Sequence, residues 1–368
     1  MSYKPLKLVS GKRQLFQSGD IPAPAIFPTW SSTPDFTNKI QPQLADLNKY
    51  SLPQTSLNLY VGSTIGGADH WGGVLAPNGY VYCIPQNPGD SIIKINPATG
   101  AATTFGSSAG FGWGGVLGFD GMIYGIPAES STVIKINPTG DVLSSFGAAI
   151  GNYNCGVVAA NGMIYAPPSA GTTKVLKINP STSTVSTFGS VTTGSNSYSS
   201  CVLAPNGMIY CVPYSWAAYP ILKINPTNDT VSTFGSVIGR WNGGVLAPNG
   251  KIYCMPAENS TAILVIDPTN DTVSTFGSYS GNGIGGGVLA PNGFIYGIPT
   301  SGAVLKINPS NNTFTTYGSP TGSWTGGVLA PNGVIYGVPN AGSGVLRIGD
   351  GFDYCPADLC LSPYFNKF

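Results

Sequence analysis

The chain repeats one pattern of apolar and polar positions seven times. Each copy opens with a run of the form GGVLAPNGxIYCIP, in which two apolar segments flank an Asn-Gly or Asp-Gly pair. The turn glycine recurs every 40 to 45 residues, at Gly79, Gly121, Gly162, Gly207, Gly250, Gly293 and Gly333. A period of this length is typical of repeat architectures, in which each unit buries its apolar side chains against its neighbours.

Each copy predicts four β-strands. The two apolar segments form a hairpin, because Asn-Gly favours the two-residue type I′ turn. A third segment of the ILKINP kind alternates apolar and polar residues, and a fourth of the TVSTF kind is rich in β-branched residues. Four strands in a period of about 40 residues are typical of a β-propeller blade. The sequence therefore predicts an all-β fold, a seven-bladed β-propeller of four-stranded blades, over residues 56–351.

The fourth strand of the last blade is missing from the end of the repeat. Six fourth strands follow the seven hairpins, and an unassigned strand, SLNLYVGS, stands before the first copy. We expect residues 57–61 to pair with the third strand of the last blade, near residues 345–348. This N-terminal strand would close the ring and leave only short, protected sheet edges.

Two segments fall outside the repeat. Residues 1–55 contain seven prolines, so most of this segment is predicted to be extended. It also carries too many apolar side chains for a solvated linker. We expect an anchoring arm that binds other protein chains through Leu6, Leu8, Leu15, Phe16 and Phe27. Residues 352–368 are expected to be a C-terminal docking tail.

Loop lengths differ between the two faces of the predicted ring. The first hairpin turn and the connection from the third to the fourth strand keep a constant length in every copy. The connections from the second to the third strand, and from one blade to the next, vary in length. Because variable loops on a fixed scaffold commonly carry binding sites, a ligand is expected on the face with these variable connections.

The variable connections are also rich in aromatic residues. Aromatic rings combine apolar area with polar edges and can stack on sugar rings. We therefore predict a glycan-binding surface formed by Trp71, Trp113, Tyr153, Tyr198, Trp216, Trp241 and Trp324. The alternative is that most of these rings pack between blades. The acidic residues of this face are interpreted as solvated loop charges: Asp69, Asp90, Glu129 and Glu258.

Composition narrows the function. Charged residues make up 8% of the 368 residues, and the net charge is +1. The chain therefore lacks the excess of basic residues that is typical of nucleic-acid-binding and membrane-surface proteins. The single histidine, His70, leaves little material for acid–base catalysis or a His-ligated metal site. We therefore predict no catalytic residue, no metal and no cofactor, and interpret Asp69-His70 as a surface dipeptide rather than a base and its orienting group.

The cysteines fit a reducing compartment. Cys83, Cys211 and Cys254 occupy one repeat position, where other copies have Gly or Ala, so they are predicted to be free thiols in a small buried slot. Cys355 and Cys360 could pair or bind a metal, and the sequence leaves their state open. The first residues lack the apolar segment of a secretory signal, and no run is long enough for a membrane helix. Synthesis in a host cytoplasm is therefore expected.

Two resemblances suggest functions. The run LKLVSGKRQLFQSGD resembles the N-terminal segments of bacteriophage virion and fibre proteins, and the repeat, with KINPTNDTVSTFGS, resembles propeller arrays in phage structural proteins. This implies a non-enzymatic virion component of the tail-fibre, head-fibre or decoration type. Such a component would be present in multiple copies, bound to other virion proteins through its arm, and would attach to host-surface glycans. Its place on the capsid, collar or tail is left open.

The second resemblance is to the virginiamycin B lyase type of seven-bladed propeller. It implies an alternative function as a propeller enzyme of this lyase type, acting on a lactone ring; the acidic residues of the variable face would instead favour a glycan-cleaving type, acting on a sugar ring. The lyase class would need a catalytic histidine beside a metal site, a pattern that His70 alone does not supply.

Overall fold

The computed structural model describes residues 6–9, 12–15, 59–64, 69–87, 89–107, 112–128, 132–148, 151–191, 198–341 and 343–349. The chain divides into two units, Met1–Asp35 and Phe36–Phe368. In the first unit, β1 (Leu6–Val9) and β2 (Lys12–Leu15) form an antiparallel hairpin with Leu6 opposite Leu15. Residues 352–368, Phe16 and Phe27 lie outside the described residues.

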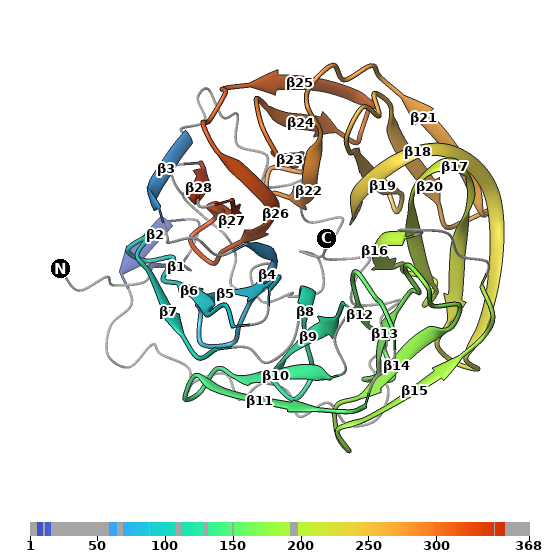
Figure 1. The fold of residues 1–368 in the computed structure, drawn as a ribbon. Helices are drawn as coiled ribbons and strands as arrows, with labels where there is room; N and C mark the ends of the chain where they lie inside the picture. The colour runs from blue at the N-terminus through green and yellow to red at the C-terminus, as the bar shows by residue number, and fades with distance from the viewer. Residues whose placement is uncertain are drawn as a thin grey trace. The chain divides into compact units, whose positions relative to one another are not determined.

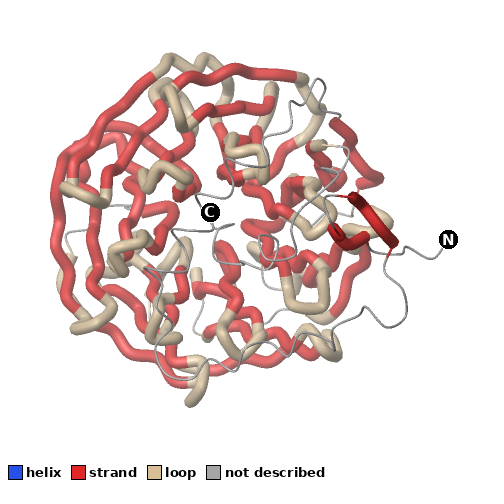
Figure 2. The backbone as a smooth tube through the Cα atoms, turned by 180° about the vertical axis from the view of Figure 1, so that it is seen from behind, coloured by secondary structure: helices blue, strands red, loops and turns tan. Residues whose placement is uncertain are grey.

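The second unit is a ring of β-sheets (Figure 1). Within the described ranges its elements are strands joined by turns and loops, with no helix, as Figure 2 shows from behind. No helix there is long and apolar enough to cross a membrane. In the four-stranded sheets the first strand of each copy lies nearest the centre, and the fourth forms the rim (Figure 1). The all-β propeller prediction is therefore confirmed.

Five of the sheets have four strands each. Their strands are β4 (His70–Leu75), β5 (Val81–Pro85), β6 (Ile92–Ile95) and β7 (Ala102–Phe105); β8 (Gly112–Leu117), β9 (Ile123–Pro127), β10 (Val133–Asn137) and β11 (Val142–Phe146); β12 (Val157–Val158), β13 (Ile164–Ala166), β14 (Val175–Asn179) and β15 (Thr184–Phe188); β22 (Ile284–Leu289), β23 (Ile295–Pro299), β24 (Val304–Asn308) and β25 (Thr313–Tyr317); and β26 (Ser323–Leu329), β27 (Ile335–Asn340), β28 (Gly344–Ile348) and β3 (Leu59–Thr64).

The remaining sheet has six strands and contains the fourth and fifth copies of the repeat. Its strands are β16 (Tyr198–Leu203), β17 (Ile209–Asn225), β18 (Thr230–Leu246), β19 (Ile252–Pro256), β20 (Ile263–Asp267) and β21 (Thr272–Phe276). The predicted count of seven separate four-stranded blades is thus corrected to six sheets. The reason is local: Tyr214 pairs with Arg240 and Tyr219 with Val237, so two connections expected to be loops form a continuous ribbon.

The N-terminal strand closes the ring. β3 pairs antiparallel with β28, with Val61 opposite Leu346 and Leu59 opposite Ile348. Leu59 also packs against the apolar core of this last sheet. The predicted closure is confirmed for residues 59–61, and residues 57–58 lie outside the described residues.

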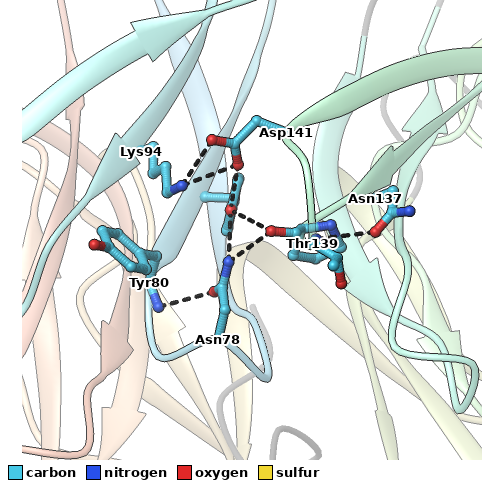
Figure 3. Close-up of polar contacts among 8 residues, drawn as sticks. Asn78, Tyr80, Lys94, Asn137, Thr139 and Asp141 are labelled. Carbon is cyan, nitrogen blue, oxygen red and sulfur yellow. Dashed lines mark hydrogen bonds and ion pairs between the residues drawn. The ribbon is translucent and has the colours of Figure 1, made fainter.

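A polar contact through a buried tyrosine joins most copies of the repeat to the next copy (Figure 3). Asn78, in the first hairpin turn, donates from Nδ2 to the Tyr82 hydroxyl and to the carbonyl oxygen of Pro138 in the next sheet, both at 2.9 Å. Tyr82 donates to Asp141 Oδ1 at 2.7 Å, and Lys94 Nζ lies 2.7 Å from Asp141 Oδ2. We call this arrangement the tyrosine seam. It satisfies a phenol that would otherwise be buried without a hydrogen-bond partner.

The seam recurs around the ring with its charges balanced. Tyr165 and Lys177 share Asp229, and Tyr210 and Lys223 share Asp271, in the same way. In the fifth copy the acceptor is uncharged, Asn312, and the lysine position holds Val265. In the second copy the carboxylate comes from the hairpin turn instead: Asp120 accepts from the Tyr124 hydroxyl at 2.6 Å, and the next sheet supplies Ser183.

The turn that supplies the acceptor has a left-handed backbone. Asp141, Ser183, Asp229, Asp271 and Asn312 have φ values of 52° to 54°. Asn and Asp tolerate this conformation better than most residues, because their short polar side chains bond the local backbone. The same position therefore suits both the turn and the seam.

The two seams next to the ring closure lack the acceptor side chain. In the seam between the last and the first sheet, Gly100 holds its position and the contacts to the proline carbonyl remain. Asn332 and Tyr336, in the last sheet, donate to the carbonyl oxygen of Pro97 in the first sheet at 2.8 and 2.9 Å. The sixth copy packs against the last sheet, whose fourth strand is β3. Because β3 does not follow β28 in the chain, the last sheet has no turn between its third and fourth strands to supply the acceptor. Lys306 lies 4.2 Å from the Phe294 ring instead, and burial lowers its pKa.

The seam predicts a charge-dependent stability. Asp141→Asn keeps a residue suited to the turn but leaves Lys94 without an anion, so we expect a loss of about 1–2 kcal/mol of unfolding free energy in urea titrations. Adding Lys94→Val reproduces the natural fifth seam and should recover most of that loss. A double variant no more stable than the single one would contradict this account.

The same pair predicts a pH dependence. Burial alone would raise the pKa of Asp141, but the hydrogen bonds from Lys94 and Tyr82 outweigh it, and the pKa is lowered. The stability from this carboxylate is present above its ordinary pKa of about 4 and is lost as the pH falls through the lowered value. The urea midpoints of wild type and Asp141→Asn should therefore converge in acid and remain apart at pH 7.

Closure predicts which N-terminal truncation is tolerated. Deleting residues 1–62 removes most of β3 and exposes the edge of β28, whereas deleting residues 1–50 leaves β3 complete. We expect the longer deletion to lower the melting temperature far more than the shorter one. Leu59→Ser in the full chain should give an intermediate loss, since it removes only the packing of β3. Equal melting temperatures for the two deletions would argue against closure by β3.

Candidate functional site

Four of the seven aromatic residues predicted to bind ligand are buried. Tyr153, Tyr198 and Trp324 are 0% exposed and Trp241 is 3% exposed. The indole N–H groups of both tryptophans are satisfied internally, because Trp241 donates to the Ala262 carbonyl and Trp324 to the Gly344 carbonyl, each at 2.8 Å. These four rings therefore belong to the packing of the sheets, and the predicted surface is corrected accordingly.

Trp71 and Trp113 lie one position later in the repeat than the buried rings. They are partly exposed and stack on each other at 4.7 Å between ring centroids, on the innermost strands β4 and β8 (Figure 1). Other copies hold small or polar residues there, and Ser199 donates to the Trp241 carbonyl at 2.5 Å. The two tryptophans therefore lie on the innermost strands, one position away from the four buried aromatic residues, and the seven residues do not form a single binding surface.

The buried position in the first copy holds His70. It is 0% exposed, with Nε2 2.9 Å from the Ser91 carbonyl oxygen, so the prediction of a surface dipeptide is wrong for this residue. Asp69 Oδ1 accepts from the backbone N–H of Ala341 in the last sheet at 2.9 Å. Both residues therefore make structural contacts with the backbone.

The remaining tryptophan, Trp216, is exposed and belongs to a cluster. Trp216 is 46% exposed, at the bend of β17. The Arg240 guanidinium carbon lies 5.1 Å from the Trp216 ring and 4.9 Å from the Tyr214 ring. Glu258 accepts from the Tyr214 hydroxyl at 2.6 Å and forms an ion pair with Arg240. We call these four residues the Arg240 cluster.

The backbone holds the cluster in place. Tyr214 and Arg240 are opposite each other in the β17–β18 ribbon. The N–H of Arg240 donates to Ser260 Oγ at 2.8 Å, and its carbonyl accepts from Ala257 at 2.9 Å. Glu258 has a left-handed backbone, with φ 33°, which is rare for this residue type. The cluster is therefore positioned by regular pairing and by a tight turn.

The chemistry of the cluster suits recognition. Burial and the hydrogen bond to Glu258 raise the pKa of Tyr214, so its hydroxyl stays protonated and keeps donating. The charges of Arg240 and Glu258 offset each other. The Glu258 side chain is 51% exposed, and its two oxygens retain lone pairs for further hydrogen bonds. An exposed indole next to such a carboxylate can hold a ring that has one apolar face and hydroxyl groups at its edge.

Sequence reasoning found Trp216 but missed Tyr214 and Arg240, and it assigned Glu258 to the solvated loop charges. The partners are 18 to 44 residues apart, so their meeting depends on the ribbon. The available signal was the rarity of arginine, since the chain has three, at Arg13, Arg240 and Arg347.

The other candidates give no second polar cluster. Asp90 accepts from Asn87 at 3.2 Å, and Glu129 lies outside the described residues. Cys83, Cys211 and Cys254 are buried free thiols, as predicted, while Cys355 and Cys360 lie outside the described residues. In the part of the chain that the structure describes, no group of three His, Cys, Asp or Glu residues is placed to hold a metal ion.

Comparisons with known proteins identify the fold. A family model described as a repeat of unknown function (DUF6923) matches residues 115–240. No curated protein matches the chain. The chain is similar to the solved structure of virginiamycin B lyase from Staphylococcus aureus, in a catalytically inactive histidine-to-alanine form with quinupristin, at 11% identity and a TM-score of 0.67; the match covers 80% of this chain and 99% of that chain. It is also similar to a streptogramin B lyase, at 12% identity and a TM-score of 0.66, covering 80% of this chain and 98% of that chain. A third similar structure is hydrazine synthase from Kuenenia stuttgartiensis, at 13% identity and a TM-score of 0.62, covering 80% of this chain and 99% of that chain. At these identities the similarity shows the propeller fold alone.

The two classes of tryptophan predict different effects on stability. Trp241→Ala empties a buried, hydrogen-bonded site and should cost about 3–5 kcal/mol of unfolding free energy. Trp216→Ala truncates an exposed ring and should cost less than about 1 kcal/mol. Urea unfolding of both variants measures the difference, and equal losses would place Trp216 in the core.

Proposed function

We propose that this protein is a non-enzymatic glycan-binding propeller whose binding site is the Arg240 cluster. The observation that carries the proposal is the exposed Trp216 indole beside a carboxylate held by Arg240 and Tyr214. The apolar face of a pyranose ring would stack on Trp216, and its hydroxyl groups would donate to Glu258. Because the cluster has balanced charges, a neutral sugar fits it better than an anionic one.

The position of the cluster in the repeat supports this assignment. The β17–β18 ribbon replaces two connections that are loops in other copies, so the cluster lies where the chain departs from its repeat. It also uses the connections from the second to the third strand and between copies, which vary in length. Variation on a fixed scaffold is typical of binding surfaces.

The setting we propose is a phage virion. Under this proposal the protein is a fibre or decoration component present in multiple copies, and its propeller face attaches to host-surface glycans. The N-terminal arm would bind other virion proteins, through Leu6, Leu8 and Leu15 of the β1–β2 hairpin and through Phe16 and Phe27. In the ring, the two halves of the six-stranded sheet would act as separate blades, because β18 pairs with β17 over residues 230–240 and with β19 over residues 241–246.

A lyase function is the second candidate, supported by the similar folds. The inactive variant of the Staphylococcus aureus lyase has a histidine replaced by alanine. In this chain the single histidine, His70, is fully buried, with Nε2 close to a backbone carbonyl oxygen. This placement favours binding over catalysis.

Glycan binding is tested by an array of neutral and anionic glycans, followed by calorimetry with a glycan that binds. We expect Trp216→Ala to raise the Kd about 10-fold or more, since it removes both stacking and apolar burial. Glu258→Gln should also weaken binding, because it removes a charged acceptor. Phe119→Ala is the matched control: this aromatic residue is 41% exposed, in the β8–β9 turn, and should leave the Kd unchanged.

Absence of any bound glycan, or equal losses in the Trp216 and Phe119 variants, would refute the site. The virion setting has a separate test. Mass spectrometry of purified phage particles should find the protein in many copies, and the protein without residues 1–50 should fold but fail to join the particle. Normal incorporation of that truncated protein would rule out the arm as the anchor.

A further inference from the structure

Small residues occupy two consecutive positions of the innermost strand segment in every copy. Most of them are glycine, and the pairs are Gly72-Gly73, Gly114-Gly115, Cys155-Gly156, Ser200-Cys201, Gly243-Gly244, Gly286-Gly287 and Gly326-Gly327. The third and fourth copies depart from this pattern by placing a cysteine in one position each.

These positions are small because neighbouring copies touch there. A Cβ atom placed on Gly243 would lie 2.8 Å from Gly286 Cα and 2.9 Å from Gly287 N, closer than real side chains allow. The first position of one copy therefore lies against the peptide bond that joins the two positions of the next copy. By the same repeat geometry, the first position of the third copy, Cys155, should lie against the Ser200-Cys201 pair of the fourth copy.

The structure shows this contact. The Sγ atoms of Cys155 and Cys201 are 3.5 Å apart, and the two residues are 4% and 1% exposed. A disulfide needs a separation of about 2.05 Å, so the two sulfur atoms must approach each other by about 1.5 Å for the bond to form. Cys211 is a second thiol close to Cys201: it lies opposite Cys201 in the β16–β17 pair, within hydrogen-bonding reach. Cys83 and Cys254 are buried too.

We propose that Cys155 and Cys201 are an oxidation site, at which hydrogen peroxide links the third and fourth copies by a disulfide. The thiolate of one cysteine attacks a peroxide oxygen, the O–O bond breaks, and hydroxide leaves a sulfenic acid behind. The second thiolate attacks that sulfur and displaces a second hydroxide. The two thiol protons and the two hydroxides become two waters, so peroxide is reduced and the two sulfurs are oxidised.

The bond would close a covalent loop between residues 46 apart in the chain. Such a loop restricts the unfolded chain and stabilises the folded one. It would also add a covalent link to a junction between sheets that is otherwise held by packing and hydrogen bonds.

The test uses the full-length protein carrying Cys355→Ser and Cys360→Ser, so that the C-terminal pair cannot react. After dilute hydrogen peroxide, catalase and alkylation under denaturing conditions, we expect a mass lower by the two thiol hydrogens and a linked peptide that joins Cys155 to Cys201. The melting temperature should rise by roughly 3–8 °C and return to its starting value with reductant.

Two matched variants use residues that the repeat already accepts. Cys155→Ser copies Ser200 of the fourth copy, and Cys201→Gly copies the glycine of most other copies, so both should fold and lose the link. Cys83→Ser and Cys254→Ser should keep it. Three results would overturn the proposal: no link after oxidation, sulfinic acid at Cys155 without a link, or a link from Cys201 to Cys211, its cross-strand neighbour.

Discussion

The buried hydroxyl of the second-strand tyrosine is the group on which the ring depends. Seven such tyrosines are 0% exposed: Tyr82, Tyr124, Tyr165, Tyr210, Tyr253, Tyr296 and Tyr336. A buried phenol without a partner is costly, and for most of these residues a partner belongs to the next copy of the repeat. In those copies the tyrosine completes its hydrogen bonding only when the next copy is present. The chain keeps the tyrosine in all seven copies while exchanging Asp for Asn or Ser at the acceptor position, and where Asn312 stands the lysine position holds Val265.

Local features of the chain were sufficient to predict the repeat and its closure. An Asn-Gly turn, an alternating third strand and a β-branched fourth strand act within about ten residues, so their consequences can be derived from the sequence. The sheet count was not predictable in this way. Whether residues 214–220 form a loop or a ladder depends on their meeting residues 236–240 in space, and neither segment has the alternation of a strand.

The candidate site, too, was predictable from the sequence only in part. Trp71 and Trp241 were predicted to lie on the same surface because both precede the glycines of the first strand. They differ by one position in the repeat, and this difference places Trp71 on the innermost strand, partly exposed, and Trp241 in the core. His70 takes the buried position in the first copy, where the fifth copy has Trp241. Arg240 and Glu258 had no sequence pattern to join them. The choice of the face with variable connections stays a prediction, and it rests on loop lengths that can be read from the sequence.

The pairing of β3 with β28 has a consequence for how the chain folds during synthesis. Val61 pairs with Leu346, so the last sheet cannot form until the chain as far as β28 has left the ribosome. Partly synthesised chains can form the earlier sheets one after another. Each of them still has an unpaired β3 strand and an exposed sheet face that the last sheet will later cover. Such strands are prone to pair with other molecules, which makes the nascent protein more vulnerable to aggregation than the finished one. Slow, long-range closure of this kind is expected to be the rate-limiting event of folding, because contacts distant in sequence form last.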